Sequence, residues 1–77
     1  MSTVAIEYCV PCGFRDRALA VQKAILNGLE GEIDELRLVM GDHGVFRVSV
    51  DGDPVYDKDE DGDYDVDDLV RSVRDAL

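Results

Sequence analysis

The 77-residue sequence lacks tryptophan and has two prolines, few aromatic residues and no long apolar run. No hydrophobic stretch approaches the roughly 20 residues that span a bilayer, which excludes a transmembrane protein. Residues 1–4 lack the basic start and apolar stretch of a secretory signal, so a cytoplasmic protein is expected. The composition is 45% hydrophobic, as in globular proteins, and the length fits a single domain over residues 1–77.

Positive charge is also scarce. Eight basic against eighteen acidic residues give a formal net charge of −10 at pH 7. Such a chain repels phosphate backbones and anionic lipids, so neither nucleic acid nor a membrane is an expected partner. Residues 51–68 contain ten of the acids and one lysine. The aspartate excess suits a halophilic protein from a high-salt cytoplasm, and a calcium-binding or simply acidic surface is the other interpretation.

The spacing of apolar residues predicts six elements and an α/β fold class, in a two-layer α+β arrangement. Period-two alternation indicates strands, and apolar residues at steps of three and four indicate amphipathic helices. Both helices should cover one apolar face of the sheet, while the other face carries Glu7, Arg47 and Ser49. Asp51-Gly52 predicts a hairpin and Asp65 a helix N-cap. The predicted segments are strand 3–8, helix 14–29, strands 36–40, 46–50 and 54–56, acidic loop 57–65 and helix 66–77.

Two cysteines, Cys9 and Cys12, stand where the first strand meets the first helix. In a cytoplasmic protein this Cys-x-x-Cys placement is typical of a redox pair. The thiolate is the reactive form, and the positive end of a helix dipole lowers thiol pKa values. Val10, Pro11 and Gly13 complete the loop and the helix start, and the proline stiffens the loop. The expected catalytic residues are therefore Cys9 and Cys12.

Other interpretations of the cysteines stay open. A zinc site would need His43 as a further ligand, or a dimer to supply four cysteines. Two buried, inert cysteines or a purely structural disulfide are also possible, although a disulfide across so short a loop would stabilise little. Arg15 and Arg17 bring positive charge to the first helical turns, which favours the redox interpretation.

The segment Cys-Val-Pro-Cys-Gly-Phe at residues 9–14 resembles the opening of the selenoprotein W-like (Rdx) family. That family begins with a strand, Cys-x-x-Cys or Cys-x-x-selenocysteine, glycine, an aromatic residue and a helix. Residues 44–52 are similar to its Gly-x-Phe-x-Val strand and hairpin. Val55-Tyr56, the turn at 61–64 and the last helix extend the resemblance over nearly the whole chain.

The resemblance implies a thioredoxin-like fold with strand order 2-1-3-4, and thiol–disulfide exchange with a partner protein or a small thiol. Cys9 matches the first family cysteine, and Cys12 the position where some members carry selenocysteine. We expect Cys9, as the more exposed sulfur, to attack and Cys12 to resolve the mixed disulfide. The alternative stays open, because selenium at the second position in some family members favours Cys12 as the attacking residue. His43 is either a proton carrier near this loop or a surface turn residue. The acidic segment after the third strand departs from the lysine-rich animal members.

Residues 57–68 fit much of a calcium-binding EF-hand loop, with acids at loop positions 1, 3, 5, 9 and 12 and glycine at position 6. Position 12 is Asp68 instead of glutamate, and a strand precedes the loop where an EF-hand has a helix. A solvated acidic turn is therefore favoured. The alternative function is a non-catalytic interaction module that binds calcium here. No metal site and no cofactor-binding motif, such as a phosphate-binding glycine loop, is predicted.

Overall fold

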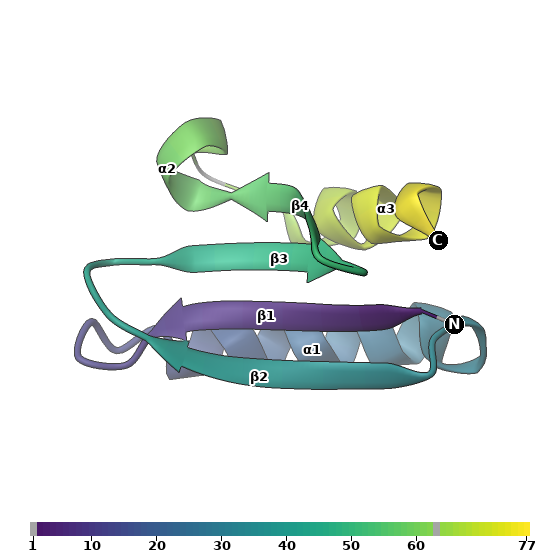
Figure 1. The fold of residues 1–77 in the computed structure, drawn as a ribbon, viewed down its shortest axis with the longest axis horizontal. Coiled ribbons are helices and arrows are strands. Elements are labelled where there is room, and N and C mark those ends of the chain that lie inside the picture. Colours follow the sequence, from purple (N-terminus) through teal and green to yellow (C-terminus); the bar gives the residue numbers. More distant parts are fainter. Residues whose placement is uncertain (1, 63) are drawn as a thin grey trace.

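The computed structural model describes residues 2–62 and 64–77. Its four strands form one sheet in the order β2-β1-β3-β4, with β2 parallel to β1 and the other pairs antiparallel (Figure 1). The predicted fold class and strand order are confirmed. The elements are β1 (Thr3–Cys9), α1 (Arg15–Leu29), a short 3₁₀ helix η1 (Glu30–Glu32), β2 (Glu35–Gly41), β3 (Phe46–Val50), β4 (Asp53–Asp57), α2 (Lys58–Asp61) and α3 (Val66–Ala76).

Both long helices cover the same face of the sheet, as predicted. α1 packs against β1 and against α3, and α3 also contacts β3 and β4. In Figure 1, α1 lies behind β1 and β2. The buried positions of β1 alternate as expected, at Val4, Ile6 and Tyr8. Burying a large aliphatic side chain contributes about 1.5–3 kcal/mol, so this alternation holds the strand in register.

An aromatic cluster closes the core at the α2 end of the sheet. The fully buried Phe46 has its ring centroid 5.3 Å from Tyr64, 6.2 Å from Tyr56 and 6.3 Å from Phe14. The two tyrosine contacts are edge-to-face, an arrangement that aromatic rings prefer. The cluster joins the start of α1 to β3, β4 and the segment before α3.

The opposite face of the sheet is polar, with one arginine linking three strands. Arg47 on β3 donates from its Nη1 to Glu7 Oε1 on β1 at 3.3 Å. It also donates from its Nε to Asp57 Oδ2 at the end of β4, at 3.2 Å. These residues are register partners across the sheet, so the expectation of a polar face with Glu7 and Arg47 is confirmed.

The turn and cap predictions are also confirmed. Asp51 and Gly52 have φ values of 52° and 90°, as a two-residue hairpin turn requires. Asp65 caps α3, because its Oδ1 accepts a hydrogen bond from the Asp67 N–H at 2.8 Å. Within the described ranges, no helix combines the length and the apolar character needed to cross a membrane.

The expected loop at 57–65 is wrong in part, because α2 occupies residues 58–61. Asp57 starts this helix by accepting a hydrogen bond from the Asp59 N–H at 3.0 Å. Gly62 follows its end with a φ of 73°, a conformation that glycine adopts easily. A four-residue helix has no apolar face of its own, so it leaves no periodic signal in the sequence.

Candidate redox site

The two cysteines form a disulfide in the turn between β1 and α1. Cys9 is the last residue of β1, and the Cα atoms of Cys9 and Cys12 are 5.3 Å apart. The Gly13 N–H donates to the Val10 carbonyl at 3.1 Å, and the Phe14 N–H donates to the Cys9 carbonyl at 3.3 Å. Gly13 has a φ of 76°, so glycine is favoured there for a conformational reason.

The connection between β2 and β3 holds the start of this loop in place. The Cys9 N–H donates to the Val45 carbonyl at 2.8 Å, and the Val10 N–H donates to the Gly41 carbonyl at 3.1 Å. Gly41 permits the close approach: a Cβ there would lie 2.8 Å from Val45 Cγ1 and 3.1 Å from Glu7 Oε2. Sequence reasoning did not find this support, because the contacts join segments more than thirty residues apart.

The cysteines differ in exposure, in the opposite sense to the expectation. Cys9 is 0% exposed, whereas Cys12 is exposed to solvent. The expectation that Cys9 is the more exposed sulfur is therefore wrong. Cys9 still belongs to the sheet, opposite Gly41 of β2 and bonded to Val45, while Cys12 lies beyond the strand in the turn. Because Cys12 is exposed, the interpretation of both cysteines as buried and inert is excluded.

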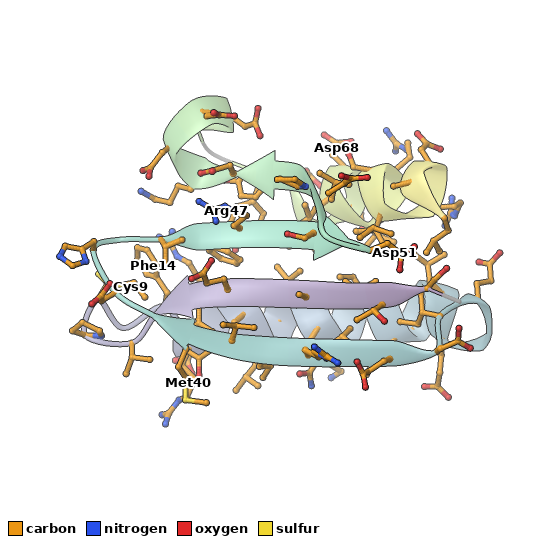
Figure 2. The ribbon with its side chains drawn as sticks, in the orientation of Figure 1. Cys9, Phe14, Met40, Arg47, Asp51 and Asp68 are labelled. Carbon is orange, nitrogen blue, oxygen red and sulfur yellow. A yellow bond between two sulfur atoms is a disulfide. The ribbon has the colours of Figure 1, made fainter. Side chains whose placement is uncertain are left out.

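An open groove runs beside the disulfide loop. Two of its side chains are apolar and solvent-exposed, Val10 by 50% and Met40 by 70%. Figure 2 shows Met40 near the same end of the sheet as Cys9 and Phe14. The groove therefore presents apolar side chains at the disulfide end of the sheet. The groove is lined by Tyr8, Val10, Gly13, Arg15, Asp16 and Met40.

Positive groups collect around Phe14, next to the disulfide. The Arg17 guanidinium carbon lies 5.0 Å from the centroid of the Phe14 ring, and the Lys58 ammonium nitrogen lies 5.7 Å from it. Phe14 precedes α1 and offers no side-chain cap to its first-turn N–H groups. Lys58 comes from α2, more than forty residues after the cysteines in the chain, so sequence reasoning did not connect it with them.

His43 lies in the β2–β3 connection as an exposed turn residue. Its φ is 59°, its ring is 90% exposed, and its Nδ1 is 2.6 Å from Asp42 Oδ1. These features favour the surface-turn interpretation over a proton carrier. In residues 2–62 and 64–77, no group of three or more His, Cys, Asp or Glu side chains is placed to hold a metal ion.

The acidic segment uses its carboxylates to bind backbone amides. Asp57 Oδ1 accepts from the Asp59 N–H, and Asp61 Oδ2 accepts from the Asp57 N–H at 2.9 Å. Two expected calcium ligands, Asp59 and Asp61, lie in helix α2, where an EF-hand has an extended loop. Asp63 lies outside the described residues. A separate hollow beside α3, away from the cysteines, is lined by Val55, Tyr56, Asp61, Tyr64, Asp65, Asp68, Leu69 and Ser72.

A four-stranded mixed sheet with its long helices on one face, and a Cys-x-x-Cys disulfide between β1 and α1, defines a thioredoxin-like protein of the selenoprotein W-like type. The chain belongs to the Rdx family, whose model matches residues 3–75. The family resemblance read from the motifs is thereby confirmed.

Relatives and solved structures agree with this assignment. The chain is 34% identical over 74 residues to migration and invasion enhancer 1 from both Bos taurus and Mus musculus. The match covers 95% of this chain and 63% of each of those proteins. A crystal structure of a Bordetella parapertussis protein is 34% identical and superposes with a TM-score of 0.93, covering 99% of this chain and 98% of that one. A selenoprotein W-related protein from Vibrio cholerae, 22% identical, has the same fold with a TM-score of 0.91, covering 97% and 95% of the two chains.

Proposed function

We propose that this protein exchanges electrons with thiols and disulfides of partner molecules through Cys9 and Cys12, with Cys12 as the sulfur that meets the partner. The observation that carries the proposal is the difference in exposure across one disulfide. Cys12 is open to solvent in the turn, and Cys9 is completely buried at the end of β1. Only the accessible sulfur of a disulfide is open to an incoming thiolate.

The exchange proceeds in two steps. In the reduced protein, the Cys12 thiolate attacks a partner disulfide, forms a mixed disulfide and releases one partner thiolate. Cys9 then loses its proton and attacks the Cys12 sulfur, which closes the protein disulfide and releases the second partner thiolate. Two electrons pass from the protein dithiol to the partner, and both partner thiolates leave reduced. The reverse sequence reduces the protein when a partner dithiol attacks Cys12.

The surroundings of Cys12 favour its thiolate. Helix α1 begins three residues after it, and its first-turn N–H groups have no side-chain cap at Phe14. The positive end of the helix dipole, with Arg15 and Arg17 nearby in sequence, stabilises negative charge on the sulfur. We therefore expect the pKa of the Cys12 thiol to lie below its ordinary value of about 8.5.

The deciding measurement is the Cys9–Cys12 equilibrium in graded dithiol redox buffers, read by thiol trapping and mass spectrometry. We expect one reversible two-electron transition, in which both cysteines are trapped together or neither is. The rate of Cys12 alkylation against pH gives the thiol pKa from the same samples. Two thiols that never form a disulfide in oxidising buffer, and that alkylate slowly at ordinary pKa values, would refute a redox function.

A further inference from the structure

Basic side chains, which are scarce in this chain, gather at the disulfide end of the molecule. Three of the eight basic residues gather there: Arg15 and Arg17 in the first turn of α1, and Lys58 at the start of α2. Figure 1 shows the turn after β1 and α2 at the same end of the sheet. The Phe14 ring joins them, because Arg17 and Lys58 both lie over it, at 5.0 and 5.7 Å.

Both cations lie over the ring of a residue that is a near neighbour of the reacting cysteine in the chain. Phe14 follows Cys12 by two residues, so their Cα atoms are at most about 7 Å apart. The Phe14 N–H also donates a hydrogen bond to the Cys9 carbonyl, which holds the Phe14 backbone beside the disulfide loop. The attraction of a cation to an aromatic face keeps Arg17 and Lys58 over the ring without neutralising either charge.

Among the described residues, no carboxylate forms a direct ion pair with this group. Across residues 2–62 and 64–77, the ion pairs involve Arg37, His43, Arg47 and Arg71, and none includes Arg15, Arg17 or Lys58. The nearest opposing charges in sequence are Asp16 on α1, Asp57 just before α2, which is paired with Arg47, and Asp59 and Glu60 on α2. Three of the other arginines, Arg37, Arg47 and Arg71, are paired with carboxylates.

We propose that Arg17 and Lys58, held over Phe14, make this site selective for thiols and disulfides that carry a carboxylate close to the reacting sulfur. The inference rests on the proposed thiol–disulfide exchange and names its substrate class. Charges more than about 8–10 Å apart in solution are largely screened at physiological ionic strength. Arg17 and Lys58 therefore act on a group that enters beside Phe14, whereas most of the acids that give the chain its net charge of −10 are too far away to do so.

The selectivity arises in the attack step. When the Cys12 thiolate attacks a carboxylate-bearing disulfide, a bond forms between Cys12 sulfur and the near sulfur, and the bond to the far sulfur breaks. In the transition state the negative charge of the thiolate is shared by the three sulfurs, and the carboxylate of the substrate adds a second negative charge nearby. Arg17 and Lys58 stabilise this combination and disfavour an incoming ammonium group. Cys9 subsequently displaces the bound thiol, so that both halves of the substrate leave as thiols.

The test uses the reduced protein and three small disulfides of different charge: anionic dithiodipropionate, neutral hydroxyethyl disulfide and cationic cystamine. Protein oxidation is followed by thiol trapping and mass spectrometry, at the lowest KCl concentration at which circular dichroism shows the protein folded. In Arg17→Gln and in Lys58→Gln, we expect the anionic rate divided by the cationic rate to fall about two- to fourfold per charge removed. A unit charge roughly 8–10 Å away in water changes each rate about twofold, in opposite directions. Lys58→Arg should keep the wild-type ratio.

Lys23→Gln is the matched control, because Lys23 is an exposed residue on α1 six positions beyond Arg17, about 9 Å further along the helix. It removes the same charge from the same helix, and we expect its ratio to fall by clearly less than that of Arg17→Gln, because the charge lies further from the reacting sulfur. An equal fall in Lys23→Gln and Arg17→Gln would overturn the proposal, since only net charge would then matter. Failure of all three probes to oxidise the protein would instead refute the exchange function itself.

A second set of probes distinguishes the source of the carboxylate. Two short peptides, each a symmetric disulfide of a single cysteine flanked by aspartates or by lysines, replace the small disulfides. If the wild-type ratio is larger for peptides than for small probes, the substrate is an acidic polypeptide segment. If the two ratios are equal, it is a small thiol acid. Ratios unaffected by Arg17→Gln and Lys58→Gln in both probe sets would contradict the proposal.

Discussion

The disulfide end and the acidic segment of this protein use charge in opposite ways. Around Phe14, Arg17 and Lys58 form no ion pair with any carboxylate in residues 2–62 and 64–77, and they lie over the ring that follows the disulfide loop. In residues 51–68, ten acids crowd together, and several of their carboxylates are hydrogen-bonded to backbone N–H groups at turns and helix starts. The comparison shows that net charge does not identify the chemistry of a small protein. The placement of a few charges relative to the reactive atoms does.

The two regions also differ in what holds them together. The disulfide loop is fixed by long-range backbone hydrogen bonds from Cys9 and Val10 to the β2–β3 connection. The acidic segment is fixed mainly by local caps, such as Asp57 to Asp59 and Asp65 to Asp67. A change in the first region should therefore affect distant parts of the chain, and one in the second should stay local.

The largest expected effect is on thiol reactivity. Cys9→Ser keeps the exposed Cys12, and we expect it to be alkylated readily by iodoacetamide and to hold a mixed disulfide with a small disulfide probe. In Cys12→Ser the remaining thiol is buried, so alkylation should be slower by on the order of tenfold or more. Circular dichroism checks the fold, and Cys9→Ala serves as a second variant. Equal alkylation rates for the two cysteines would show that burial in the oxidised form does not persist on reduction.

A moderate effect is expected at Gly41, which supports the disulfide loop. Gly41→Ala places a Cβ 2.8 Å from Val45 Cγ1, and overpacking of this kind costs about 1–3 kcal/mol in the free energy of unfolding. Urea denaturation of the oxidised protein measures it. Gly31→Ala is the control, because a Cβ there meets nothing within 4 Å. We expect it to raise the free energy of unfolding by no more than about 1 kcal/mol. If Gly41→Ala and the wild type had the same free energy of unfolding, a glycine at position 41 would not be needed to support the disulfide loop.

The smallest effect is expected in the acidic segment. Glu60→Gln relieves like-charge repulsion among residues 51–68 and should stabilise the fold by about 0.2–0.5 kcal/mol at low salt. Added KCl should raise the urea midpoint of the wild type, and less so that of the variant, since salt screens the same repulsion. Glu32→Gln removes an exposed charge outside the segment and is the control. A wild-type midpoint that does not rise with KCl would argue against a halophilic design.

Much of the fold was predictable because its signals are local. The alternation of Val4, Ile6 and Tyr8 gave β1, and Asp51-Gly52 gave the hairpin, since each pattern reports the conformation of its own residues. Helix α2 was missed because four residues carry no apolar period. The EF-hand spacing falls in an aspartate-rich stretch, and two of its expected ligands, Asp59 and Asp61, lie in that helix instead of in a loop.

The sequence alone determined that a Cys-x-x-Cys pair stands between a strand and a helix. The strand, the loop and the helix are each indicated by the pattern of residues that are adjacent in the chain. Only the tertiary structure decided which cysteine is exposed and which charges surround it. Cys9 is buried at the end of β1, where its backbone N–H is hydrogen-bonded to the β2–β3 connection. Lys58 reaches Phe14 because the order of the strands brings α2 to the disulfide end of the sheet. These are contacts between residues about 35 to 45 positions apart, and such contacts depend on how the whole chain packs.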